Sequence, residues 1–453
     1  MSEQDATLDE FAGDVDDPSE QEGERRLPEI DSIPDDWNLV TVEEVAEEIL
    51  GGGTPSKSNN DYWGGEIPWA SVKDLGAIKL SDPEDSITEA GVENSATNVV
   101  RANSVVISTR MTVGEPFLNE VDMAINQDMK AVIPNTEMMN SLFLVYSLWD
   151  KDPYLKSLGR GTTVDGITTN DLSRTHIGLP SLEEQRKIAS VLYTVDQAIR
   201  KTEEIISQLD RTRAGLTQSL FLNGYRDYDE VVEAHHRNRL PKHPASWETK
   251  PAKEVIQVTR GAHPRPKSDI SLWGGDIPMI KIGDRNRGDS QTITSTEDTV
   301  TEKGSRSSKL VDRGTLIVSN AGTVGAARIT GMEACIHDHW LILRGFEEKL
   351  DTRYLYYFIN WNQDFLESLA SGSTVLDLNT DDFRLFDLTF PEIEEQREIA
   401  DVLDGIHKKK TKNKEYNEQL QRLKQGLMQD LISGEIRTHD KNIEIVDDVL
   451  QYG

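Results

Sequence analysis

The stretch PSLEEQRKIASVL at residues 180–192 occurs a second time as PEIEEQREIADVL at residues 391–403. Each copy has a proline and acidic residues ahead of a spaced apolar pattern, which is typical of the start of an amphipathic α-helix. In the first copy, Ser181 and Glu184 also have the spacing of a capping box. A helix start that occurs twice in one chain indicates an internal duplication.

Sequence similarity between the two halves extends well beyond these helix starts. The N-terminal part of each half matches at an offset of 210 residues, and the rest matches at 211. The matching segments are Trp37 and Trp247, DYWGGEIPWASVKDL (61–75) and SLWGGDIPMIKIGDR (271–285), Thr112-Val113-Gly114 and Thr323-Val324-Gly325, and LTQSL (216–220) and LMQDL (427–431). Two similar halves are therefore expected, with the glycines of the WGG motif in a tight turn.

Each half has short β-like runs followed by a long helical segment. The predicted fold class is α+β: an internally duplicated chain with two mixed α/β domains separated by two long, antiparallel coiled-coil helices. The expected ranges are an acidic tail at 1–33, globular domains at 34–180 and 244–391, helices at 181–222 and 392–434, a linker at 223–243 and a C-terminal tail at 435–453.

The two helical segments have apolar residues at heptad spacing, which is typical of a coiled-coil seam. Thr202 and Arg213 fill two positions of the first seam, and the middle of the second seam is polar. A helix of 40 residues is about 60 Å long, so mutual packing is the simplest way to bury both stripes. The apolar seam positions are Ile188, Leu192, Val195, Ile199, Ile206, Leu209, Leu216, Leu220, Ile399, Leu403, Ile406, Leu420, Leu427 and Leu431.

The composition is strongly acidic, with a net charge of −31. By itself this argues against a nucleic-acid partner. Residues 1–36 contain 14 Asp/Glu and two Arg, so the charge is uneven. We interpret the acidity as salt adaptation, because at about 1 M salt the Debye length is only about 3 Å. Unfolding at low salt would support this halophilic interpretation, and stability at low salt would contradict it.

Other sequence features limit the class of protein. The chain has no apolar run of about 18 residues and no signal-peptide pattern at its N-terminus, so we expect a cytoplasmic protein with no membrane partner. The single cysteine, Cys335, excludes a disulfide framework, and we expect it to be buried. His337-Asp338-His339 resembles a metal cluster, but we expect the two histidines to lie on a strand and to point to opposite faces. We therefore expect no metal site.

Catalytic motifs are absent from the sequence. GGGTPSK (51–57) is rich in glycine but lacks the spacing of a phosphate-binding loop. Asp152-Pro153-Tyr154 is one proline short of an adenine-methyltransferase motif, and we expect it to lie in a helix. No catalytic residue and no cofactor is therefore expected in this chain.

The duplicated order of domain and helix, with the motifs WGG-x-IP, TVG and P-x-x-EEQR-x-IA, resembles the specificity subunits of type I restriction-modification systems. The resemblance covers roughly residues 34–434. It implies that the globular domains are target-recognition domains, each reading half of a split site in double-stranded DNA. It also implies that the helices dock two methyltransferase subunits, together with restriction/translocase subunits. S-adenosylmethionine, ATP and Mg would then bind those partner subunits.

Basic and amide side chains in loops are the candidates for DNA contacts. Residues 253–309 contain ten Lys/Arg against eight Asp/Glu, which is locally basic in this acidic chain. The predicted contacts are Lys57, Lys73, Arg110, Lys130 and Arg160 in the first domain, and Arg260, Arg265, Lys267, Lys281, Arg285, Arg287, Asn320 and Arg328 in the second.

Two other classes of protein fit parts of the sequence. One is a coiled-coil scaffold that binds proteins and no DNA; the locally basic loops argue against it. The other is a nuclease or methyltransferase with a diverged site, against which the missing catalytic motifs argue. The lysine-rich run at 408–414 could be a DNA-binding helix face, but we interpret it as a solvated surface.

Overall fold

The computed structural model describes residues 33–159, 166–233, 237–371 and 376–453. Arg160 and nearly all of the predicted acidic tail lie outside these residues. By their internal contacts the residues form two units, one of residues 1–200 with 419–453 and the other of residues 201–418. Each unit therefore combines one globular domain with parts of both long helices.

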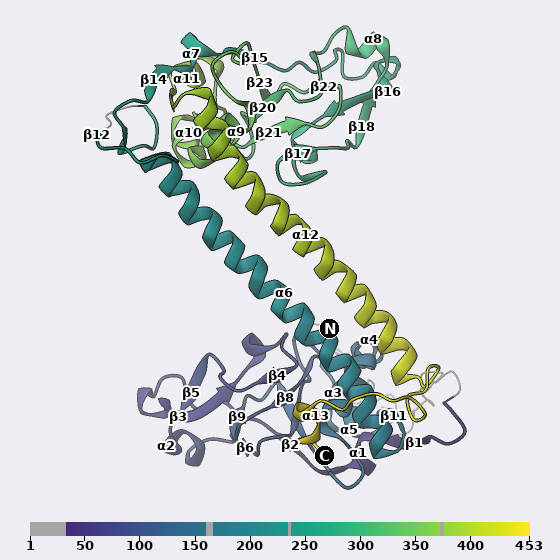
Figure 1. Cartoon of the computed structure of the whole chain (residues 1–453). Coiled ribbons are helices and arrows are strands. Elements are labelled where there is room, and N and C mark those ends of the chain that lie inside the picture. The colour runs from purple at the N-terminus through teal and green to yellow at the C-terminus, as the bar shows by residue number, and fades with distance from the viewer. Residues whose placement is uncertain (1–32, 160–165, 234–236, 372–375) are drawn as a thin grey trace, which may run out of the picture. The chain divides into compact units, whose positions relative to one another are not determined.

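The first globular domain contains three sheets, seen in the lower part of Figure 1. The strand orders are β1-β11, β2-β10-β7-β8-β4 and β5-β3-β9-β6. The strands are β1 (Asn38–Thr41), β2 (Ala46–Gly51), β3 (Trp63–Ala70), β4 (Lys79–Leu80), β5 (Asp85–Ile87), β6 (Val99–Val100), β7 (Val105–Ser108), β8 (Pro116–Asn119), β9 (Met123–Ile125), β10 (Met129–Pro134) and β11 (His176–Leu179).

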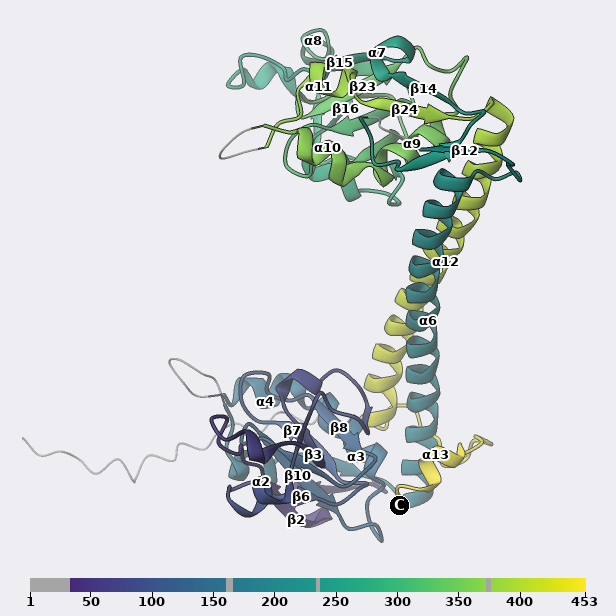
Figure 2. The ribbon, with the colours of Figure 1, turned by 90° about the vertical axis from the view of Figure 1, so that its left-hand side faces the viewer.

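The helices of this domain are short except for α3 (Ser141–Asp150), which packs on β7 and β8 (Figure 2). Eight successive residues of α3 are buried, as expected for a helix covered on all sides. The others are α1 (Val42–Val45), α2 (Glu89–Glu93), α4 (Asp152–Ser157) and α5 (Thr169–Ser173). Asp152-Pro153-Tyr154 thus opens a helix, as the sequence predicts.

The second globular domain repeats this topology strand for strand. Its orders are β14-β24, β15-β23-β20-β21-β17 and β18-β16-β22-β19. The elements are β14 (Glu248–Pro251), α7 (Ala252–Val255), β15 (Gln257–Arg260), β16 (Trp273–Ile280), β17 (Thr292–Ile293), β18 (Asp298–Val300), α8 (Glu302–Ser305), β19 (Leu310–Val311), β20 (Leu316–Ser319), β21 (Ala327–Thr330), β22 (Ala334–Ile336), β23 (Trp340–Arg344), α9 (Thr352–Trp361), α10 (Gln363–Leu369), α11 (Thr380–Arg384) and β24 (Asp387–Phe390).

The WGG motif occupies the same place in both domains. Gly64 and Gly274 have φ angles of 75° and 74°, the left-handed region that glycine adopts without strain. A side chain at Gly65 would meet the carbonyl oxygen of Ile87 at 2.5 Å. The motif forms a bulge at the start of β3 and β16 where the sequence predicted a tight turn. Trp63 and Ile67 both pair with Ile87 in the first domain, and Trp273 and Ile277 both pair with Val300 in the second. Cys335 on β22 is fully buried, as predicted.

The long helices are α6 (Leu182–Asn223) and α12 (Ile393–Ile432). In the first unit, Ile188 and Leu192 of α6 share a core with Leu431 at the end of α12. In the second unit, Leu220 at the end of α6 shares a core with Ile399 and Leu403. The two helices are therefore antiparallel, and each apolar end of the predicted seam is part of a domain core.

Between its apolar ends the helix pair is held by polar contacts. Lys410 forms an ion pair with Asp210 at 2.5 Å, and Lys424 forms one with Asp196 at 2.7 Å. Lys410 belongs to the lysine-rich run, so that run is partly engaged with α6. Leu216, a predicted seam residue, is 37% exposed. The middle of the seam is therefore less apolar than a continuous coiled coil.

The repeated EEQR sequence forms the same buried joint in each unit. The side-chain amide of Gln185 donates to the carbonyl oxygens of Met138 and Pro180, both at 2.9 Å, and its oxygen accepts the N–H of Asn140, the N-cap residue of α3. Gln396 makes the equivalent contacts with Lys349, Pro391 and Asp351. These side-chain amides fix the start of each long helix to its own domain.

The neighbouring glutamates hold the chain that leaves the opposite helix. Glu184 accepts from Arg437 at 2.9 Å and from the Thr438 N–H at 3.1 Å. Glu395 accepts from the N–H of Tyr225 at 2.9 Å and from the Tyr228 hydroxyl. The predicted capping box is therefore wrong in part: Ser181 accepts the Glu184 N–H at 3.3 Å, but the Glu184 carboxylate binds elsewhere.

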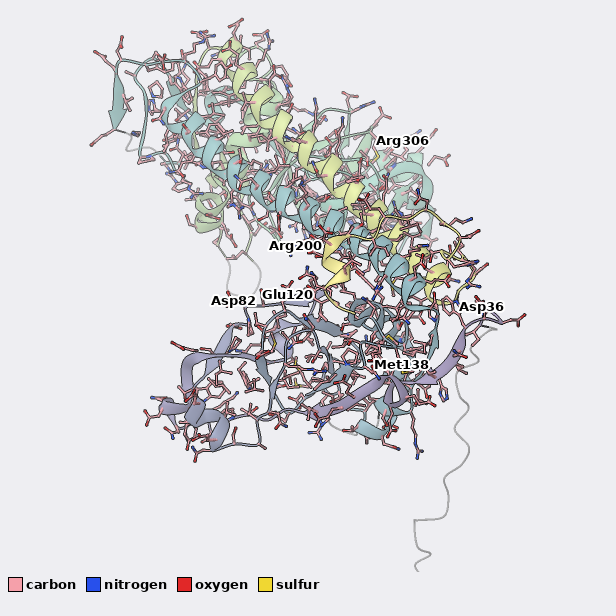
Figure 3. The ribbon with its side chains drawn as sticks, turned by 60° about the horizontal axis from the view of Figure 1, so that its bottom comes forward. Asp36, Asp82, Glu120, Met138, Arg200 and Arg306 are labelled. Carbon is pink, nitrogen blue, oxygen red and sulfur yellow. The ribbon has the colours of Figure 1, made fainter. Side chains whose placement is uncertain are left out.

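The C-terminal segment docks on the first globular domain rather than forming a free tail. Residues after α12 include α13 (Asp447–Leu450), whose Val449 is buried in the domain core. Asp448 accepts from the Tyr193 hydroxyl at 2.7 Å, and Asn140 donates to the carbonyl oxygen of Val449 at 3.1 Å. Arg437 also pairs with Asp36, which lies just before β1 (Figure 3). In the second unit the segment after α6 forms β12 (Val231–Glu233) and β13 (Lys242–Pro244).

We predict that Glu184→Gln lowers the free energy of unfolding by about 2 kcal/mol at neutral pH. Glu184 is 2% exposed; burial alone would raise its pKa, but hydrogen bonds from Arg437, Thr438 and Trp37 outweigh burial and lower the pKa. A lowered pKa contributes stability above the unfolded-state value, and this stability is lost as the pH falls through the folded value.

The measurement is thermal unfolding at several pH values. The difference between wild type and Glu184→Gln should shrink on acidification. Glu183→Gln is the matched control, because Glu183 lies one position away and is 71% exposed. Equal destabilisation by the two substitutions would contradict a specific role for the buried carboxylate.

Candidate DNA-recognition clefts

A cleft lies at the WGG motif of the first globular domain, with a volume of about 760 Å³. Trp63 and Trp69 form one side, and their rings meet edge to face at 5.1 Å. The polar side chains that line it include Thr54, Lys57, Lys73, Asn126, Gln127 and Asp128. Asn and Gln side chains can bind adenine through two hydrogen bonds, so this lining suits a base edge.

The second globular domain has a cleft of about 360 Å³ at the same place in the repeat. It is lined by Lys267, Lys281 and three histidines, His263, His337 and His339. The turn between β22 and β23 provides residues 337–339, and the turn between β9 and β10 provides residues 126–128 in the first domain. The two domains therefore share a frame but differ in the polar side chains that it presents.

The expected placement of His337 and His339 on opposite faces of a strand is wrong. β22 ends at Ile336, and residues 337–339 form a turn before β23. The two rings lie 4.6 Å apart between centroids. Residues two apart would share one face even on a strand, so strand geometry gave no reason to expect them to diverge.

Two of the predicted DNA contacts are exposed at equivalent positions. Lys57 and Lys267 each line the cleft of their domain, and neither ammonium group has a polar partner among the described residues. Arg110, Lys130 and Arg285 likewise have no side-chain ion pair within the described part of the chain. A cation without an internal partner can bind phosphate or a base without breaking an existing contact.

Other predicted contacts are already paired with acidic residues. Lys73 lies 3.5 Å from Asp85 and 3.6 Å from Glu84, and these carboxylates raise its pKa. Lys281 lies 2.5 Å from Asp298 and over the Trp273 ring. The remaining pairs are Arg260 with Asp377, Arg265 with Asp338 at 3.9 Å, and Arg287 with Asp284 and Glu297. Contact with DNA would have to compete with these pairs.

Two predicted contacts are covered by the protein, Asn320 completely and Arg328 in part. Asn320 is fully buried, and its amide donates to Asp377 at 2.9 Å. Arg328 donates to the backbone carbonyl of Arg285 at 3.0 Å, and burial lowers its pKa. We therefore leave both residues out of the DNA-contacting set. Arg160 lies outside the described residues.

Gln127 and Asn126 are cleft residues that the sequence reasoning missed. Amide side chains were expected among the DNA contacts, but Asn320 was the one amide predicted and the other predicted contacts are basic. A usable signal was nevertheless present: the motifs on either side match between the halves, but positions 126–128 and 337–339 differ. Domains that read different half-sites must differ at the residues that contact bases.

Sequence comparison shows the family. Residues 34–211 and 244–422 match the type I restriction modification DNA specificity domain, so the chain belongs to this family. It is 23% identical over 426 residues to the putative type I restriction enzyme MjaX specificity subunit of Methanocaldococcus jannaschii. The aligned region covers 90% of this chain and 96% of that subunit. With the MjaIX specificity subunit of the same organism it is 28% identical over 271 residues, covering 58% of this chain and only 61% of that subunit.

Further comparisons agree with this assignment. The chain is 34% identical over 152 residues to the Escherichia coli EcoR124I/EcoR124II specificity subunit, covering 32% of this chain and 38% of the relative. The fold is similar to the crystal structure of the type I restriction-modification S subunit from M. genitalium, with a TM-score of 0.59 and 15% identity over 89% of this chain and 97% of that chain. Among the described residues, no helix is long and apolar enough to span a bilayer.

We predict that Lys267→Ala weakens the binding of every DNA duplex by a similar factor. A phosphate contact carries no sequence information, and its loss should reduce the slope of log affinity against log salt by about one. The measurement is a titration of several duplexes at a series of salt concentrations. Lys250→Ala is the control, because Lys250 lies on β14 and pairs with Glu248 at 2.8 Å. A loss confined to one sequence would contradict a phosphate contact.

We predict a different pattern for Arg285→Ala. If Arg285 contacts a base, its removal should cost about 1–3 kcal/mol for the correct site and relax one position of that site. Binding to a set of duplexes with single base changes measures both effects. An unchanged preference at every position would remove Arg285 from the base-contacting set.

Proposed function

We propose that this chain is the specificity subunit of a type I restriction-modification complex and reads a bipartite DNA site. The observation that carries the proposal is the pair of equivalent clefts with different polar linings. Thr54, Asn126 and Gln127 line the first cleft, where His263, His337 and His339 line the second. Two recognition domains that share a fold but carry different cleft side chains suit a DNA site with two different halves.

The chain contributes recognition and docking rather than chemistry in this proposal. Two methyltransferase subunits and the restriction/translocase subunits would bind it, and S-adenosylmethionine, ATP and Mg would bind those subunits. The helix pair supports the docking role, since its middle is polar and its flanks are solvent-exposed at residues such as Ile205, Tyr416 and Leu423.

The test is a methylome of a host that expresses this chain together with its methyltransferase partner. We expect one methyladenine motif made of two short blocks around an unspecified spacer, and no such motif when either protein is omitted. Methylation by this chain alone would favour the enzyme alternative. Methylation by the partner with an unchanged motif in the absence of this chain would contradict the proposal.

A further inference from the structure

The cleft of the second globular domain contains a cluster of three histidines. The centroids of the His337 and His339 rings lie 4.6 Å apart, and those of His263 and His337 lie 4.8 Å apart. Ligand atoms of His337, Asp338 and His339 all lie within 4.8 Å of one another. His263 is not a member of that group, but its ring lies against the ring of His337.

His263 is the residue of the cluster whose buried ring nitrogens are available to a ligand. Its side chain is 9% exposed, and neither ring nitrogen has a hydrogen-bond partner among the described residues. A buried polar group without a partner costs about 1–3 kcal/mol, and such groups are rare in folded proteins. An ion bound by the imidazole would remove this cost.

The backbone holds His263 close to the other two histidines. The N–H of Gly261 donates to the carbonyl oxygen of Trp340, and that of Ala262 to Ile336, both at 2.9 Å. A side chain at position 261 would lie 2.2 Å from the carbonyl oxygen of His337, so only glycine permits this approach. The loop that carries His263 is thus joined to the turn that carries His337 and His339.

The side chain of His337 contacts the residues that follow it in the turn. Its Nδ1 lies 2.8 Å from Oδ1 of Asp338. The backbone N–H of His339 donates to the same Nδ1 at 3.3 Å, so both following residues of the turn contact this side of the His337 ring.

The charges that line the cleft are largely paired with one another. Lys281 pairs with Asp298 at 2.5 Å, and Arg287 pairs with Asp284 and Glu297. Lys267, which lines the same cleft, is the cation whose repulsion a bound ion would have to overcome.

We propose that His263, His337 and His339 bind one transition-metal ion of the Zn²⁺ type, with Asp338 orienting His337. Zn–N bonds are about 2.0–2.1 Å long, and three histidines with one open position form a common coordination set. The ion would join the loop of His263 and Lys267 to the turn between β22 and β23. This assignment goes beyond the proposed function and replaces the expectation of no metal site.

The first globular domain provides matched replacement residues. Asn126 and Asp128 occupy the positions of His337 and His339 at the 211-residue offset. In that cleft Thr54 donates to Gln127, so its polar groups are bonded to one another. The double substitution His337→Asn/His339→Asp therefore installs side chains that the same turn already accommodates.

The experiment titrates the metal-stripped full-length chain with Co²⁺ and follows the visible ligand-field absorption. We expect one Co²⁺ per chain, displacement of Co²⁺ by Zn²⁺, and a higher melting temperature with Zn²⁺. The double variant and His263→Gln should each weaken Zn²⁺ binding at least about tenfold. His176→Asn, on β11 of the other globular domain, is the control and should bind like wild type.

Circular dichroism of each variant checks that it is folded. Wild-type protein that shows neither Co²⁺ bands nor a Zn²⁺-dependent rise in melting temperature would overturn the proposal. Co²⁺ bands that persist in the folded double variant would also overturn it, because they would place the ion elsewhere. If the double variant does not fold, the same binding measurements on His263→Gln decide the question.

Discussion

The structure depends on a buried polar joint that the EEQR sequence forms twice. Gln185 and Gln396 fix the start of each long helix to the domain before it, and Glu184 and Glu395 hold the chain that leaves the opposite helix. A buried carboxylate is stable only when its partners are in place, so each joint forms only when the start of one long helix and the chain that follows the other come together. This explains why each unit needs residues from both halves of the chain.

The joint belongs to the framework that the two halves of the chain share, whereas the cleft residues differ between the halves. The glutamate and glutamine of the joint match between the repeats, although their partners differ, and so does the WGG motif at the start of β3 and β16. The turns at 126–128 and 337–339 project from that common frame and differ completely. A duplicated scaffold with unlike cleft residues is what recognition of a two-part site requires, and the family assignment rests on the same duplicated segments.

Much of the architecture could be predicted from the sequence, because duplication and heptad spacing are local signals. The helix predicted at 181–222 lies at Leu182–Asn223, and the one predicted at 392–434 lies at Ile393–Ile432. The second role of Glu184 could not be predicted, since its partner Arg437 is 253 residues away. The docking of the C-terminal segment was missed for the same reason.

The candidate sites were predicted less well, because charge in a loop does not show where a side chain points. Asn320 follows a buried strand and is itself buried, whereas Lys57 and Lys267 line clefts. The sequence singled out His337-Asp338-His339 as resembling a metal cluster, and the expectation that its two histidines point to opposite faces was the error, because residues two apart on a strand share one face. The approach of His263 could not be predicted, since this residue comes from a different loop.

The most direct test of the account exchanges residues 34–180 for the corresponding domain of another specificity subunit and determines the methylated site. The joint residues Glu184 and Gln185 lie outside the exchanged segment and stay in place. The account predicts that one half of the bipartite site changes while the other half is kept. A change in both halves, or in neither, would contradict the claim that each globular domain reads its own half-site.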